Sequence, residues 1–153
     1  NYAGTLLPYK EIVENGYDEI IFLNASNENI IDEARSANIF VLKGTVLKTP
    51  VLQGSILPGI TRDSVIKVAS KIFNLDVREE DVSLDELMNA DEVFFTGTAA
   101  VIAPVGKIVY KNNEIRFKIS FEESMTRKIR ERLIDIQYEN IEDPFGWVIP
   151  LGK

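Results

Sequence analysis

Apolar and polar positions along the chain follow two periods, which separate strands from helices. Short apolar or alternating runs predict strands at residues 19–23, 30–34, 38–42, 45–49, 76–79, 92–95, 101–110 and 114–118. Apolar residues spaced three and four apart predict helices over residues 4–15, from Thr61 to Asn74, and over 121–138. A capping box at Ser83 and Glu86 opens a further brief helix.

Turn-forming residues separate these elements. The Asn- and Ser-rich stretch 24–29 predicts a turn, Lys43-Gly44 a compact hairpin, and residues 50–59 a loop. The tail 143–150 is expected to be extended. The pattern contains no repeat, low-complexity tract or internal linker. It therefore predicts a single mixed α/β (α+β) domain over residues 1–153, with several helices around a sheet.

Composition narrows the possible chemistry. The 153 residues are 45% hydrophobic and 27% charged, which is ordinary for a globular domain. Cysteine and histidine are both absent, which argues against Cys/His metal sites, cysteine nucleophiles and Ser-His-Asp triads, so no metal is expected. A net charge of −7 argues against nucleic acid and anionic membranes as partners. The apolar runs are too short to span a bilayer, and a cytoplasmic location is expected.

Two short segments have the character of anion sites. In Leu57-Pro58-Gly59-Ile60-Thr61-Arg62, a Pro-Gly turn enters a helix whose first N–H groups suit a phosphate; alternatively, this is only an N-capped helix. In Thr96-Gly97-Thr98-Ala99-Ala100, small residues at the end of an apolar strand expose N–H groups in an anion nest; alternatively, this is an ordinary tight turn.

A third segment, Glu33-Ala34-Arg35-Ser36-Ala37-Asn38-Ile39-Phe40, places a carboxylate and an amide among apolar neighbours. A buried carboxylate needs a cation or several donors, although Glu33 could instead face solvent while Asn38 completes a turn. Together the three segments suggest a phosphorylated cofactor that carries a positive group.

These segments, in this order and spacing, resemble the fold-type IV (class IV) pyridoxal-phosphate aminotransferases. The resemblance begins at Asn1-Tyr2 and extends over the whole chain. Residues 56–63, the turn 97–100 followed by Pro104-Val105-Gly106, and the ending 137–147 are most similar to the branched-chain amino acid aminotransferases. The resemblance implies the large, C-terminal cofactor-binding domain of the D-amino acid aminotransferase-like fold, a mixed sheet or pseudo-barrel with surrounding helices.

The resemblance also implies a role for individual residues. Glu33 would pair with the protonated pyridine nitrogen of pyridoxal 5'-phosphate, Tyr2 would hydrogen-bond its phenolic oxygen, and Leu57 would pack on the ring. Backbone N–H groups of Ile60 and Thr61 and the Thr98 hydroxyl would bind the phosphate. The substrate-binding residues implied are Ser36, Thr98, Ala99 and Ala100, the last three through amides that hold the α-carboxylate.

The implied reaction is reversible transamination of leucine, isoleucine and valine with 2-oxoglutarate, by a homodimer. The family's Schiff-base lysine is expected just upstream of Asn1, and an N-terminal domain is expected before it. The chain by itself is therefore expected to be an inactive fragment. Arg35 occupies a position where the family usually has a small residue, so the loop is altered or Arg35 points outward. Alternatives are an aminodeoxychorismate lyase, a D-amino acid aminotransferase, or a non-enzymatic domain that binds a phosphorylated ligand or a protein.

Overall fold

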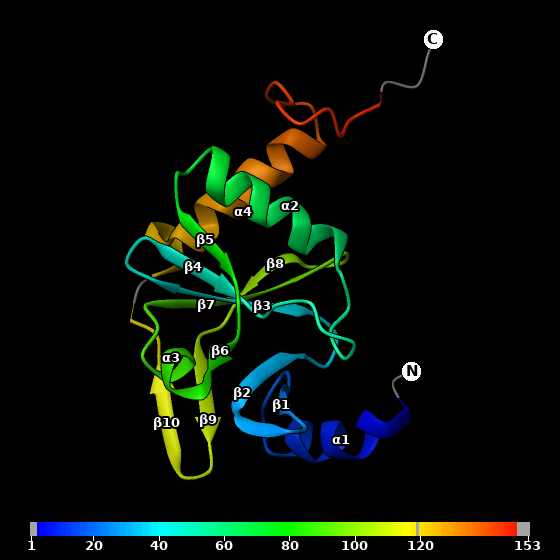
Figure 1. Cartoon of the computed structure of the whole chain (residues 1–153), viewed down its shortest axis with the longest axis vertical. Helices are drawn as coiled ribbons and strands as arrows, with labels where there is room; N and C mark the ends of the chain where they lie inside the picture. The colour runs from blue at the N-terminus through cyan, green and yellow to red at the C-terminus, as the bar shows by residue number, and fades with distance from the viewer. Residues whose placement is uncertain (1–2, 119, 150–153) are drawn as a thin grey trace.

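The computed structural model describes residues 3–118 and 120–149, and its helices and strands are arranged around a central sheet (Figure 1). The helices are η1 (Ala3–Thr5), α1 (Leu6–Glu14), α2 (Ile60–Lys71), α3 (Leu84–Met88), η2 (Phe121–Glu123) and α4 (Met125–Gln137). The strands are β1 (Ile21–Asn24), β2 (Asn27–Ala34), β3 (Asn38–Lys43), β4 (Val46–Thr49), β5 (Asp76–Glu79), β6 (Val82–Ser83), β7 (Glu92–Gly97), β8 (Val101–Pro104), β9 (Lys107–Tyr110) and β10 (Asn113–Arg116).

The central sheet has the strand order β5-β4-β3-β7-β8 and is antiparallel except for the parallel pair β4 and β5. Helices α2 and α4 cover one of its faces (Figure 1). The core between them contains Phe40 of β3 and Phe94 of β7, whose rings stack with centroids 5.1 Å apart. Strand β3 is buried along nearly all its length, on both faces. Its sequence is therefore a nearly continuous apolar run and does not alternate between apolar and polar residues.

Smaller elements pack on the opposite side of the sheet. Strands β1, β2 and β6 form a three-stranded antiparallel sheet, and β9 and β10 form a separate hairpin. A second core, which includes Ile31, Ile39 and Leu87, joins these elements and α3 to the central sheet. The mixed α/β architecture predicted from the sequence is confirmed.

Three local predictions are wrong in detail. Residues 24–29 do not form one long turn, because β2 begins at Asn27 and the Asn24 carboxamide closes a tighter turn through the N–H groups of Ser26 and Asn27. The run 101–110 is two strands, since β8 pairs with β7 while β9 pairs with β10. The tail does not extend freely: the N–H groups of Phe145 and Val148 donate to the Asp143 carboxylate, and the tail packs on the core.

The boundaries of α2 also differ from the prediction. The helix begins at Ile60 with Gly59 as its N-cap and ends at Lys71, whereas the pattern placed Thr61 at its start and Asn74 at its end. Asn74 instead has a positive φ, a conformation that asparagine tolerates in the turn after a helix. The start of β3, the end of β7 and the start of α2 lie close together, because Asn38 pairs with Thr96 and bonds to Leu57.

Candidate cofactor-binding site

Glu33, near the end of β2, is held by donors from two other segments. Its Oε2 atom accepts hydrogen bonds from the Leu57 backbone N–H at 3.2 Å and from Asn38 Nδ2 at 3.4 Å. Burial raises the pKa of the Glu33 carboxyl, the Leu57 N–H lowers it, and the nearby Asp32 raises it again. Within the described residues, Oε1 accepts no hydrogen bond. Glu33 therefore does not simply face solvent, and one of its oxygens is available to a cation.

The loop before α2 contacts this carboxylate through the Leu57 backbone and carries two exposed apolar side chains. Leu57 is 70% exposed and Ile60 is 85% exposed, so neither side chain is packed in the core. Gly59 is the N-cap and has no side chain, so no side chain caps the first turn of α2. The N–H groups of Ile60 and Thr61 are thus positioned as the free donors of a helix N-terminus, as a phosphate requires.

The turn between β7 and β8 contains the second segment that was predicted to bind an anion. Thr98, Ala99 and Ala100 are exposed, follow the end of β7 at Gly97, and line a cavity of about 1080 Å³ together with Ser36. Thr96, which precedes them, is buried, and its hydroxyl has no hydrogen-bond partner among the described residues. A turn of small, exposed residues at the rim of a large cavity suits the amide-based anion nest that was predicted.

Ser36 and Arg35 occupy the turn between β2 and β3. The Ser36 hydroxyl donates to Glu19 Oε2 at 2.6 Å, so it is already engaged by a carboxylate. The Arg35 guanidinium lies 3.9 Å from the centroid of the Tyr9 ring and its Nε is 3.8 Å from Glu19 Oε1. The outward orientation considered for Arg35 is therefore wrong: its side chain is 18% exposed and connects α1 to this turn.

The structure thus brings Leu57 into direct contact with Glu33, and Ile60 follows three residues later at the start of α2. It places Ser36, Thr98, Ala99 and Ala100 around one cavity. Tyr2 lies outside the described residues. The convergence of Thr61 and Thr98 on one phosphate stays a prediction.

Two polar residues of this region had no role assigned from the sequence. Asn38 was placed at the start of a predicted strand, with a turn as the alternative. It is 6% exposed on β3, and its Nδ2 donates to the Leu57 carbonyl at 2.8 Å, a contact across 19 residues, so the turn alternative is wrong. Glu19 was taken as part of an apolar strand, yet it contacts both Ser36 and Arg35. Contacts between distant segments have no signature in a single sequence, although an amide flanked by apolar residues in a strand could have indicated one.

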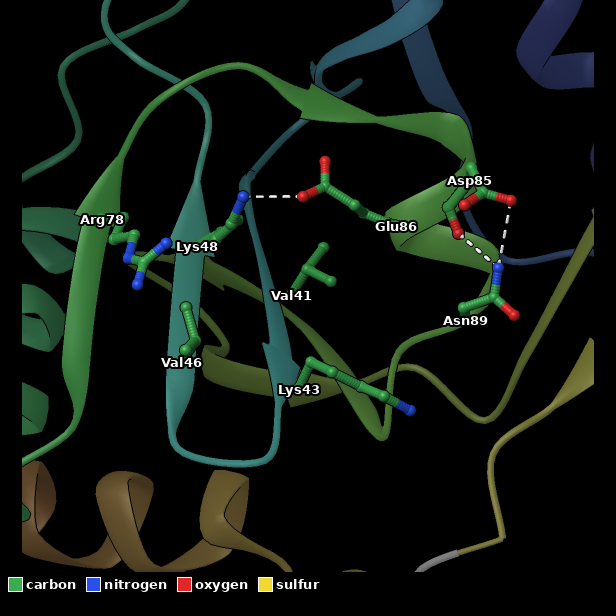
Figure 2. Close-up of a pocket in the computed structure, with 8 residues that line it drawn as sticks. All are labelled: Val41, Lys43, Val46, Lys48, Arg78, Asp85, Glu86 and Asn89. Atoms are coloured by element: carbon green, nitrogen blue, oxygen red, sulfur yellow. Dashed lines mark hydrogen bonds and ion pairs between the residues drawn. The ribbon is translucent and has the colours of Figure 1, made fainter.

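A smaller cavity of about 310 Å³ lies between β4 and α3 (Figure 2). Its side chains are already paired: Lys48 with Glu80 and Glu86, Lys43 with Asp91, and Arg78 with Asp76. The hydrogen bond from Lys48 and those from Ser83 lower the pKa of Glu86 to about 2. These pairs neutralise one another, so this cavity has the character of a structural ion-pair network and not of a ligand site.

A family model described as amino-transferase class IV matches residues 1–108. The chain belongs to this family. It is 43% identical to branched-chain-amino-acid aminotransferase 2, chloroplastic, of Arabidopsis thaliana, over 99% of the chain and 39% of that protein. It is 36% identical to methionine aminotransferase BCAT4 of the same plant, over the whole chain and 43% of that protein.

Among solved structures, the chain resembles the branched-chain amino acid aminotransferase of Thermobaculum terrenum in its PLP form. The TM-score is 0.79 at 31% identity, and the match covers 92% of this chain and 44% of that one. The chain thus spans less than half the length of the relatives it matches. No helix in the described residues is long and apolar enough to cross a membrane.

The residues present fit a pyridoxal phosphate group. A carboxylate with one uncommitted oxygen can meet a cationic ring nitrogen, the exposed Leu57 can cover a ring face, and the uncapped start of α2 can meet a phosphate. Leu57 and the start of α2 belong to one segment, and this segment contacts Glu33 of β2 through the Leu57 N–H.

Proposed function

We propose that this chain is the cofactor-binding domain of a pyridoxal-phosphate-dependent branched-chain aminotransferase, which transfers the amino group of leucine, isoleucine or valine to 2-oxoglutarate. The observation that carries the proposal is the Glu33 carboxylate, whose Oε2 is fixed by the Leu57 N–H while Oε1 is left for a cation. Membership of the class IV aminotransferases and the similarity to branched-chain enzymes support it.

Glu33 would hold a proton at the pyridine nitrogen. Because burial has already raised the pKa of its carboxyl, an adjacent cation recovers much of the lost solvation and favours the charged carboxylate. When bound, pyridoxal phosphate supplies the electron sink that makes the substrate α-proton acidic. Glu33 would thus keep the ring nitrogen positive while that proton is removed.

The remaining residues of this chain would bind and orient. The backbone N–H groups of Ile60 and Thr61 and the Thr98 hydroxyl would hold the phosphate, and Leu57 would pack on the ring. The amides of Thr98, Ala99 and Ala100 would hold the substrate α-carboxylate, with Ser36 nearby. Tyr2 would donate to the phenolic oxygen of the cofactor. Each of these contacts restricts the ring and the substrate to one relative orientation.

The whole enzyme would contain more than this chain. The proposal includes a lysine just upstream of Asn1, an N-terminal domain that completes the substrate pocket, and assembly as a homodimer. A cytoplasmic location is also proposed, although the relative from Arabidopsis thaliana with 43% identity is chloroplastic.

The test is amino-donor profiling of the full-length protein with 2-oxoglutarate as acceptor. L-leucine, L-isoleucine and L-valine should support glutamate formation at least tenfold faster than D-alanine, and aminodeoxychorismate should release no pyruvate. L-methionine belongs in the panel because one relative is a methionine aminotransferase. Activity confined to D-alanine, pyruvate release from aminodeoxychorismate, or no reaction with any donor would overturn the proposal.

A further inference from the structure

Asn38 lies between Glu33 and the loop that precedes α2, and its side chain bonds to both. Its Nδ2 donates to the Leu57 carbonyl at 2.8 Å and to Glu33 Oε2 at 3.4 Å. The Leu57 N–H donates to the same Oε2 at 3.2 Å, which closes a ring of three hydrogen bonds. We propose that Asn38 is a positioning residue for the reaction: it orients the Glu33 carboxylate by fixing it to the backbone of Leu57.

The orientation of the amide follows from its neighbours. Both groups that Nδ2 meets, a carbonyl and a carboxylate, are acceptors, so the nitrogen and not the oxygen must face them. Each of the two Nδ2 protons then donates one hydrogen bond. Because Asn38 is 6% exposed, water cannot easily replace these bonds, and the arrangement is rigid.

The other end of the same amide, Oδ1, lies against Gly59. A Cβ atom at position 59 would lie 2.2 Å from Asn38 Oδ1, far inside van der Waals contact. The oxygen therefore occupies the space that any other residue at position 59 would fill. Gly59 has an ordinary extended conformation, with φ at −68° and ψ at 136°, so its backbone does not require glycine. Close packing against Asn38 is the reason for glycine here.

Side chains similar in size to asparagine cannot make the same contacts at position 38. An aspartate would place a second negative charge against Glu33, and a serine would be too short to reach both acceptors. The register between β3 and β7 also holds Asn38 in place, because Asn38 at the start of β3 pairs with Thr96 on β7. Oε2 of Glu33 is committed to this network, which aims Oε1 in one direction. This inference rests on the proposed function, because the direction matters only if a cation binds there.

A purely structural role makes a different prediction. If Asn38 only stabilises the fold, its loss lowers Tm, the Leu57 N–H stays on Glu33, and the pKa of Glu33 is unchanged. If Asn38 positions Glu33, its loss also removes a donor that favours the charged carboxylate, so the pKa of Glu33 rises. The pKa of Glu33 in the cofactor-free protein therefore separates the two roles, and it does so without any enzymatic assay.

The experiment compares Asn38→Ala and Asn38→Asp with a matched control, Thr49→Ala, in the full-length protein. Thr49 is fully buried in the same sheet and donates to the Ile39 carbonyl at 2.8 Å, without contact to Glu33. Carboxyl ¹³C NMR of glutamate-labelled, cofactor-free protein gives the pKa of Glu33, with Glu33→Gln to assign the signal. Absorbance titration with pyridoxal phosphate gives its dissociation constant, and thermal unfolding gives Tm.

Both Asn38 variants should raise the pKa of Glu33, Asn38→Asp more strongly, and weaken pyridoxal phosphate binding by about tenfold or more. Thr49→Ala should lower Tm comparably and leave both quantities as in the wild type. An unchanged Glu33 pKa in Asn38→Ala, with only a loss of Tm, overturns the inference. If the wild type does not bind pyridoxal phosphate, the proposed function fails, while the NMR result still decides whether Asn38 controls Glu33.

A second variant keeps the test available if Asn38→Ala does not fold. Gly59→Ala should displace the Asn38 amide without deleting it, and so reproduce the rise in the Glu33 pKa. In the Asn38→Ala background, where no amide is present to be displaced, Gly59→Ala should add less than about a twofold change in binding. An unchanged Glu33 pKa in Gly59→Ala would contradict the contact on which the inference depends, and so would fully additive effects of the two substitutions where Asn38→Ala folds.

Discussion

Arg62, in the first turn of α2, forms an ion pair with Glu79 at the end of β5, with Nη1 2.9 Å from Oε2. Its Nη2 donates to the Pro50 carbonyl at 2.9 Å, and the residue is only 3% exposed. One guanidinium thus joins the start of α2, the loop after β4 and the edge strand β5. It fixes the segment that carries Leu57 and Gly59 relative to the sheet.

Arg62→Lys should destabilise the protein by about 2 kcal/mol, because an ammonium cannot reach both partners with the geometry of the guanidinium fork. Glu79 is 47% exposed, so Glu79→Gln should cost only about 0.5 kcal/mol. Urea unfolding of both variants measures the difference. Equal decreases in the free energy of unfolding of the two variants would show that the exposed ion pair, and not the buried contact with Pro50, provides the stabilisation.

Glu92 caps α4 from a different element. Its carboxylate, on β7, accepts hydrogen bonds from the Met125 N–H, the Thr126 N–H and the Thr126 hydroxyl at 2.6–2.8 Å. Glu92→Ala should leave these buried donors without a partner and destabilise the protein by about 2–3 kcal/mol. Circular dichroism during thermal unfolding measures this loss of stability. Glu123→Ala, an exposed site just before α4, is the control and should change stability by less than about 0.5 kcal/mol.

The Asp143 carboxylate holds the tail through backbone donors. The Val148 N–H lowers the pKa of Asp143 most, and the N–H groups of Phe145, Trp147 and Gly146 lower it further. Because the folded-state pKa lies below the unfolded value of about 3.9, this stabilisation is complete above that value and is lost as pH falls through the folded pKa.

Trp147, the single tryptophan, stacks on Phe145 with centroids 4.2 Å apart and reports on this turn. Its fluorescence should stay constant from neutral pH to about pH 4 and change below it. Asp143→Asn should remove that acid transition, whereas Asp81→Asn should retain it. A transition centred above pH 5 would contradict the direction of the Asp143 pKa shift.

Predictability from sequence varied with the range of the contacts involved. The helices, most strands and the Ser83–Glu86 capping box were predictable because period and capping are local. The split of residues 101–110 was not, because β8 pairs with the preceding strand β7 and β9 with the following strand β10, and a nearly continuous apolar run does not mark where one pairing ends and the other begins. Likewise, Glu33 was recognised as a candidate, but its contacts with Leu57, 24 residues away, and with Asn38, on another strand, have no local signature in the sequence.

The polypeptide of 153 residues, taken alone, should fold but bind pyridoxal phosphate weakly and show no transamination. None of its lysines lies in segments 33–40, 57–62 or 96–100. Without further protein around the cavity, water would also compete for the phosphate and ring contacts. Borohydride reduction after incubation with the cofactor, followed by peptide mapping, is the measurement. A single specific, stoichiometric adduct on one of its lysines would refute the placement of the reactive lysine outside this chain.

Glu33 is the proposed partner of the pyridine nitrogen, and the proposed function depends most on this contact. Glu33→Gln in the full-length protein keeps the shape of the side chain but removes the charge that would hold the nitrogen protonated. With pyridoxal phosphate still bound and Tm within a few degrees of the wild type, kcat for leucine with 2-oxoglutarate should fall on the order of 10²- to 10³-fold. A Glu33→Gln enzyme that binds the cofactor and retains near wild-type kcat would contradict the account.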